Sequence, residues 1–239
     1  MKAVASRNIK YVGHTDQGGR GDGVQVMVNR GYAYIGHGFS NGITVIDVHD
    51  AKHPKPVNFL ACPPNTRAHH LQTHEDLLLA VNGPSVWTMQ VSQEAYFSGT
   101  SAAALEGQKF TGGLRIFDIS RGEAPREIAF LPLGVLGPHR IWYVGGRYAY
   151  VSVHLPEFSD HVLVIVDVAE PTKPQVAGKF WLPGMWTAWP VAISTAIVSP
   201  TARPTPSSTA ASRPFLAAGT STRYTSCQRV APSANPASR

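Results

Sequence analysis

The sequence predicts an all-β fold in which a unit of four strands occurs three times. The first indication is a short apolar segment that ends in Asp and occurs at residues 41–48, 112–119 and 161–168. The second is a turn containing proline that follows each copy, at residues 52–56, 122–125 and 171–174. A strand repeated at long spacing is typical of repeat proteins. Because four antiparallel strands in about 40 residues form one propeller blade, we expect an incomplete β-propeller of about three four-stranded blades.

The first unit shows all four expected strands. Val24, Val26 and Val28 alternate with polar or small residues, which is the period of a β-strand. Three further apolar segments follow between short turns, at residues 32–36, 43–48 and 56–60. The unit therefore predicts one blade over about residues 24–62.

The second and third units repeat this order. We expect blades at about residues 66–132 and 138–182, and the tripeptide Tyr-Ala-Tyr occupies the same place in the first and third units. The second unit is longer because of an insertion at about residues 84–111. Insertions in repeat proteins map to loops on one face, often the binding face. The partial propeller is thus expected to span residues 1–184.

The repeated Asp residues have a structural explanation. Asp47, Asp118 and Asp167 each end a strand immediately before a turn. Asp side chains accept hydrogen bonds from backbone N–H groups one or two residues later and so start turns. Three copies on three blades cannot share one active site, so we expect a structural role for them.

The composition changes after residue 184. Residues 185–239 contain no acidic residue and no lysine, and they are rich in Ala, Ser, Thr, Pro and Arg. A segment with so little apolar bulk cannot offset its ordering entropy by burial, so an irregular or disordered low-complexity tail is expected. The alternative is that this segment is translated out of frame, since a further blade should begin near Trp186 and does not.

The string Leu-Val-Ile-Val-Asp at residues 163–167 resembles the LVIVD-repeat family, and residues 43–47 and 114–118 are close variants of it. The similarity covers about residues 24–183. The resemblance implies a β-propeller, and most members of the family have no assigned activity. A propeller of this family needs more than three blades, so the chain is expected to be a fragment or to complete itself by self-association through its open blade edge.

Charge and composition exclude several classes of partner. The chain has a formal charge of +6, but all acidic residues precede residue 171 and seven basic residues follow it, which leaves the first 170 residues at −1. A nearly neutral body does not predict nucleic-acid binding. No apolar segment reaches the roughly 18 residues of a membrane span. Two unpatterned cysteines, Cys62 and Cys227, and no signal peptide predict a cytoplasmic protein.

Histidines supply the candidate chemistry, since all ten lie before residue 162. Strands one and two of a blade form a hairpin, so residues that begin the first strand and end the second should meet at one rim of the propeller. We therefore predict a transition-metal site at this rim. Its candidate ligands are His37, His70, His139 and His154.

Three neighbours of these residues are candidates for binding an anionic ligand. They are Arg67, His69 and Arg140. Adjacent residues on a strand point to opposite faces, so at most one of His69 and His70 is expected to face the channel. The alternative for each histidine is a solvated or hydrogen-bonded structural role.

Two functional hypotheses follow. The first is a binding or scaffold module whose rim receives a protein or a small-molecule ligand. The second is a metal-dependent enzyme, redox or hydrolytic, that uses the histidines. The sequence leaves open whether the protein is an enzyme.

Overall fold

The computed structural model describes residues 8–86, 88, 109–134 and 137–187. Twelve strands in these ranges form three four-stranded antiparallel sheets, which confirms the predicted all-β fold of three four-stranded blades. Blade 1 consists of β1 (Gly23–Asn29), β2 (Tyr32–His37), β3 (Gly42–Asp47) and β4 (Lys55–Ala61). Blade 2 consists of β5 (Thr66–His74), β6 (Leu77–Pro84), β7 (Gly113–Asp118) and β8 (Arg126–Pro132). Blade 3 consists of β9 (Pro138–Trp142), β10 (Tyr148–His154), β11 (His161–Asp167) and β12 (Gln175–Phe180).

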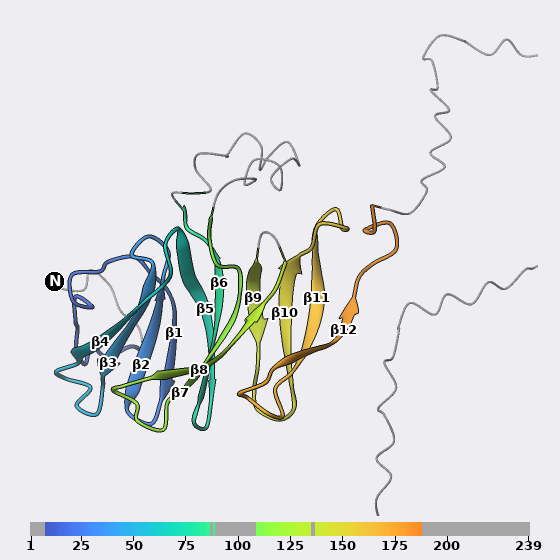
Figure 1. Ribbon diagram of the computed structural model, residues 1–239. Coiled ribbons are helices and arrows are strands. Elements are labelled where there is room, and N and C mark those ends of the chain that lie inside the picture. The colour runs from blue at the N-terminus through green and yellow to red at the C-terminus, as the bar shows by residue number, and fades with distance from the viewer. Residues whose placement is uncertain (1–7, 87, 89–108, 135–136, 188–239) are drawn as a thin grey trace, which may run out of the picture.

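Each blade is a meander in which consecutive strands are neighbours (Figure 1). The contacts between blades are made by the early strands: β1, β2 and β3 contact β5, and β5 and β6 contact β9. The first strands β1, β5 and β9 therefore lie on the side where the blades converge. This is the arrangement of propeller blades around an axis.

The three repeated Asp residues form the turns that were predicted for them. One carboxylate oxygen, Oδ1, accepts a hydrogen bond from the backbone N–H two residues later in each copy. The distances are 3.0 Å from His49 to Asp47, 2.9 Å from Ser120 to Asp118 and 3.0 Å from Ala169 to Asp167. The same local bond thus ends the third strand of every blade.

Two apolar layers hold the blades together. Tyr34, Ile43 and Val45 of blade 1 pack against Leu71, Leu78 and Phe117 of blade 2, and all six are buried. A second layer joins the opposite face of blade 2 to blade 3 and includes Leu79, Leu114, Ile141, Val151 and Val164. Each blade therefore presents one set of apolar side chains to the blade before it and the alternate set to the blade after it.

Polar bonds also cross between blades 1 and 2. The Tyr34 hydroxyl donates to the Gly122 carbonyl oxygen at 3.1 Å, and the Asn29 amide donates to the Glu75 carbonyl oxygen at 2.9 Å. The buried guanidinium of Arg115 pairs with Glu127 at 2.7 Å and donates to the Ala61 carbonyl oxygen at 3.4 Å. These directional bonds fix the register between the two blades.

The predicted tail at 185–239 lies almost wholly outside the described residues, as does most of the predicted insertion at 84–111. At the end of the described chain, Phe158 and Trp186 form an isolated antiparallel bridge. In the part of the chain that the structure describes, no helix is long and apolar enough to span a membrane.

Candidate metal centre

The start of β5 contains a β-bulge that positions two histidines. Ala68 pairs with Asn82 and His70 with Val81, so His69 is an extra residue with no direct cross-strand partner. An extra residue breaks the alternation of side chains along a strand. The expectation that the side chains of His69 and His70 point to opposite faces is therefore wrong, since their ring centroids lie 4.7 Å apart.

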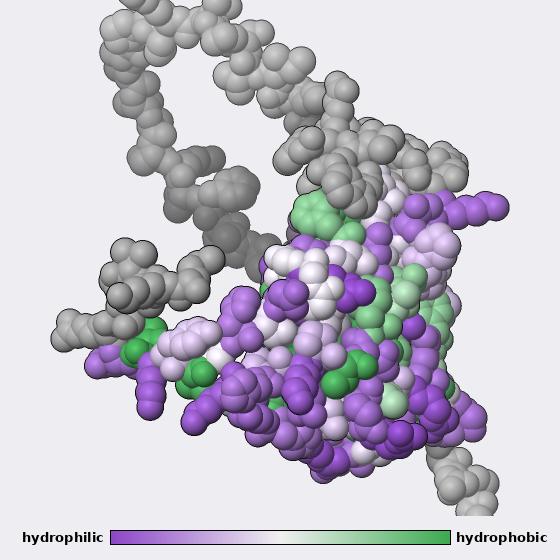
Figure 2. All heavy atoms as spheres, turned by 90° about the vertical axis from the view of Figure 1, so that its left-hand side faces the viewer, coloured by the Kyte–Doolittle hydropathy of each residue, from purple (hydrophilic) through white to green (hydrophobic). Residues whose placement is uncertain are grey.

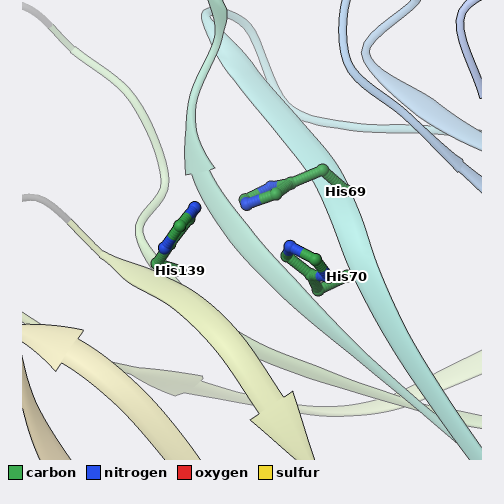
Figure 3. A group of neighbouring side chains, drawn as sticks. All are labelled: His69, His70 and His139. Carbon is green, nitrogen blue, oxygen red and sulfur yellow. The ribbon is translucent and has the colours of Figure 1, made fainter. Parts of the chain in front are cut away.

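A third imidazole comes from the neighbouring blade. His139 lies in β9, and its ring centroid is 5.6 Å from that of His69 and 5.7 Å from that of His70. Figure 3 shows the three side chains pointing toward one another, two from β5 and one from the facing strand. We call His69, His70 and His139 the histidine cluster.

The ring nitrogens of the histidine cluster lie somewhat farther apart than the ligand atoms of a bound metal ion. One ring nitrogen from each of the three residues can be chosen so that all lie within 4.8 Å of one another. Tetrahedral Zn²⁺ with Zn–N bonds of about 2.0–2.1 Å needs ligand nitrogens about 3.4 Å apart. The three nitrogens would therefore have to move closer together to bind such an ion.

Gln25 on β1 fixes the orientation of His70. Its side-chain carbonyl oxygen lies 3.0 Å from Nδ1 of His70 and accepts the backbone N–H of Leu71 at 2.8 Å. Because a carbonyl oxygen can only accept, Nδ1 of His70 carries the proton and Nε2 keeps its lone pair. An outer hydrogen bond that sets the tautomer in this way is the usual support of a metal-ligating histidine.

His69 is buried, and its ring lies beside the backbone of His139. Its residue is 4% exposed, and neither ring nitrogen makes a hydrogen bond of acceptable geometry. An imidazole has one donor and one acceptor, and leaving such groups buried and unsatisfied costs about 1–3 kcal/mol. A bound ion would accept the lone pair of His69 and remove part of this cost.

The histidines of the cluster are neutral at pH 7. Burial, assisted by the positive charge of Arg67, lowers the pKa of His69 to about 2. Burial and the nearby Arg140 lower the pKa of His70 to about 4, and burial also lowers the pKa of His139. Neutral imidazole is the form that binds metals, so no proton must be displaced at neutral pH.

Two arginines place positive charge beside the cluster. Arg67 precedes the bulge on β5, and Arg140 follows His139 on β9. Both lower the pKa values of His70 and His139 through their charge. The three predicted anion-site residues, Arg67, His69 and Arg140, therefore lie at one location together with two of the predicted metal ligands.

The other two predicted metal ligands differ from these. His37, at the end of β2, is fully buried, with Nδ1 3.0 Å from Asp22 and Nε2 2.8 Å from Thr44. Both of its nitrogens are therefore used inside blade 1. The structure does not bring His37 into the histidine cluster.

His154, at the end of β10, lies one step away from the cluster. Its ring centroid is 5.4 Å from that of His161, which in turn is 5.5 Å from that of His139. The sequence analysis did not single out His161. Its position could have been predicted from the hairpin, because His154 and His161 are cross-strand partners at the end of β10 and β11. The imidazoles of His139, His161 and His154 thus form a row that continues from the cluster across blade 3.

Gly36 allows blades 1 and 2 to approach each other closely at the bulge. A Cβ atom on Gly36 would lie 2.7 Å from the carbonyl oxygen of Ala68 and 3.2 Å from the carbonyl carbon of His69. Those backbone atoms cannot give way without shifting the bulge. Glycine at this position therefore contributes to the placement of both β5 histidines.

A separate hollow lies at the opposite ends of the same strands. It has a volume of about 500 Å³ and is lined by residues of blades 2 and 3 that include His74, Asp76, Tyr143 and Arg147. The charges on this lining are mixed, and the three-histidine grouping that the described residues offer for a metal lies elsewhere. The histidine cluster is therefore the better candidate for a functional site.

Comparison with known proteins supports the fold assignment through the repeat. No curated protein matches the chain. Among solved structures, the N-terminal domain of Nup159 is similar at a TM-score of 0.25 and 8% identity, over 61% of this chain and 45% of that one. The chain thus spans less than half the length of that structure. The LVIVD repeat itself matches residues 20–57 and 140–181, which cover most of blades 1 and 3. These two repeat matches, together with three successive blades of one design, support the resemblance of the chain to the LVIVD-repeat family.

Proposed function

We propose that this protein is a β-propeller binding module whose ligand is a transition-metal ion held by the histidine cluster. The observation that carries the proposal is the pairing of geometry and burial at His69. Within the described residues its two buried nitrogens make no hydrogen bond of good geometry, although the backbone of His139 lies beside the ring, and the ring faces two further imidazoles. Buried polar groups in native proteins are normally satisfied, so an unsatisfied imidazole in such a cluster supports a ligand.

The donor set favours particular metals. Three neutral imidazoles suit Zn²⁺, Cu²⁺, Fe²⁺ or Ni²⁺ better than the oxygen-seeking Mg²⁺ and Ca²⁺. Three protein ligands also leave one position of a tetrahedral ion open. The proposed site can therefore hold an ion and still accept a further ligand.

A metal-dependent enzyme, hydrolytic or redox, is the second candidate function. Specific support for it comes from Arg67 and Arg140, whose charge acts on the imidazoles of the cluster. Neutral imidazoles contribute no negative charge, so a divalent ion held by them, with two arginines nearby, would attract an anion to its open position. Such an anion would be a hydroxide or an oxyanion group of a substrate.

The proposal is tested by metal binding to the full chain. After removal of metal with a chelator, calorimetric titration with Zn²⁺ should show one site per chain. His69→Ala and His139→Ala should each weaken binding by at least 100-fold, because each removes one of three ligands. His53→Ala is the matched control, since His53 is a surface histidine with a side chain 75% exposed that pairs with Asp50. Absence of stoichiometric binding, or unchanged binding in both cluster variants, would contradict the proposal.

The enzyme candidate is tested by the response of the metal-loaded protein to an anion. With Co²⁺ in the site, addition of phosphate should change the visible spectrum of the ion. Arg140→Met should weaken this response about 10-fold and leave the Co²⁺ stoichiometry unchanged, because Arg140 is not a proposed ligand. A spectrum that phosphate does not alter would favour binding without catalysis.

A further inference from the structure

The two outer faces of the three-blade array are apolar and exposed. On blade 1, Val26 and Val28 of β1 are 55% and 63% exposed, and Figure 2, which faces this side, shows hydrophobic side chains among hydrophilic ones. We call these two valines the blade-1 outer face. The blade-3 outer face exposes the apolar side chains Trp142, Tyr150, Leu163 and Phe180, and Arg140 and Ser152 share the same surface of that sheet.

Strand register shows that the blade-3 outer face is equivalent to faces that the next blade covers in blades 1 and 2. Tyr34, Leu79 and Tyr150 occupy one position in the three blades, since each pairs with the residue two before the repeated Asp. Tyr34 and Leu79 are 0% exposed because the next blade covers them, whereas Tyr150 is 39% exposed. Tyr150 therefore has the surroundings of a residue whose following blade is not supplied by the described residues.

The third strand shows the same difference. Ile43, Leu114 and Leu163 are equivalent, since each lies four residues before the repeated Asp and pairs with the second strand of its blade. Ile43 and Leu114 are 0% exposed and Leu163 is 36% exposed. The blade-3 outer face thus repeats the surface by which blade 1 binds blade 2 and blade 2 binds blade 3.

The blade-1 outer face repeats the opposite surface. Val26, Leu71 and Ile141 pair with equivalent residues of the second strand in their blades. Leu71 is 0% exposed and Ile141 is 8% exposed because the preceding blade covers each of them. Val26 is the exposed member of this set. The two outer faces are therefore the two halves of one blade-to-blade interface.

We propose that a second copy of this chain covers both faces, so that two copies form a closed six-bladed ring. The blade-3 outer face of each copy packs on the blade-1 outer face of the other, which makes two identical interfaces related by a two-fold axis. Closed propellers typically contain 4–8 blades. The described residues of one copy supply three blades, so two copies bring together six and three copies nine, and six is the number that fits.

The segment before β1 lies on the outer part of the same side of blade 1. The Arg20 guanidinium stacks over the Phe59 ring of β4 at 3.8 Å, and Gly13 lies against the backbone of Ala51. This segment covers the outer strands and leaves the valines of β1 exposed. Neighbouring propeller blades diverge toward their outer strands. In the proposed ring this segment would therefore fill the wider outer part of the gap between blade 1 and blade 3 of the other copy, while the inner strands of the two blades make contact.

The mass of the full chain in solution tests the proposal. Light scattering after size exclusion should give twice the 25.7 kDa of one chain. Val26→Glu and Leu163→Glu should each reduce the mass to that of one chain, because each introduces a charge into both interfaces. Lys173→Glu places the same acidic side chain in an exposed turn and should leave the mass doubled.

Mixing the two face variants separates this ring from other dimers. A copy with Val26→Glu and a copy with Leu163→Glu together keep one interface free of substitutions, so their equimolar mixture should regain the doubled mass. Recovery also shows that each variant is folded. A monomeric wild-type chain would overturn the proposal. So would a Val26→Glu variant that stays dimeric while Leu163→Glu does not, because that result indicates two blade-3 faces packed on each other.

Discussion

Two buried histidines at neighbouring strand ends have opposite surroundings. His37, at the end of β2, has Asp22 on one ring nitrogen and Thr44 on the other. His69, in the bulge of β5, is nearly as buried but has no hydrogen-bond partner of acceptable geometry on either nitrogen. The difference separates an imidazole that stabilises a blade from one that is available to a ligand. Burial alone does not distinguish the two roles, whereas hydrogen-bond satisfaction does.

We expect the largest change in the free energy of unfolding when His37 is replaced. His37→Ala leaves buried Thr44 without its imidazole partner, removes one of the hydrogen bonds to Asp22 and opens a cavity, so the free energy of unfolding should fall by about 3 kcal/mol. Urea denaturation of wild type and variant measures this change. Zn²⁺ titration of His37→Ala at urea concentrations where it is still folded should show one binding site. Loss of that site in the folded variant would show that His37 contributes to metal binding.

Replacing His69 should stabilise the metal-free protein, by less than His37→Ala destabilises it. His69→Leu replaces an unsatisfied buried imidazole by an apolar side chain, so the metal-free protein should gain about 1–2 kcal/mol in its free energy of unfolding. The same denaturation experiment in the presence of Zn²⁺ should stabilise wild type and leave His69→Leu unchanged. Destabilisation of the metal-free variant would show that the imidazole has a structural partner.

The pH dependence of stability gives the third test. An unfolded histidine has a pKa near 6.5, whereas His69 in the folded protein has a pKa of about 2. As the pH falls below 6.5, the unfolded chain binds the proton first, so the free energy of unfolding decreases toward lower pH. The contribution of His69 is up to about 1.4 kcal/mol per pH unit.

Denaturation midpoints between pH 6.5 and pH 5 lie above the range in which carboxyl groups such as Asp118 titrate in the unfolded chain, so the slope there reports the histidines with lowered pKa values, His70 and His139 included. His69→Leu should reduce the slope of the metal-free protein by this amount. If the free energy of unfolding changed equally with pH in wild type and variant, the pKa of His69 would be nearly the same in the folded and unfolded protein, and the prediction would be wrong.

The strands and their order could be predicted because each blade carries its own local signals. The Asp that ends the third strand, the turn bond to the residue two positions later and the Tyr-Ala-Tyr strand depend on residues close in sequence. Similar local segments fold similarly wherever they occur. The sequence therefore indicated three four-stranded blades without any knowledge of how they pack.

The site was only partly predictable because it depends on contacts between blades. The gathering of His70 and His139 follows from the hairpin geometry of the blades. The bulge that turns His69 to the same side as His70 is one extra residue, and the pattern of apolar residues does not reveal it. The support from Gln25 crosses from β1 to β5, a contact that sequence spacing cannot show. His37 was misjudged because its partners, Asp22 and Thr44, lie in its own blade.

X-ray absorption at the zinc edge of the Zn²⁺-loaded full chain tests the central claim most directly. We expect three imidazole nitrogens at about 2.0–2.1 Å, with one oxygen ligand completing the coordination. His139→Ala should reduce the imidazole scattering by one third or abolish binding. A first shell of oxygen atoms without imidazole scattering, or one that contains sulfur from a cysteine, would contradict the assignment of the histidine cluster as a metal site.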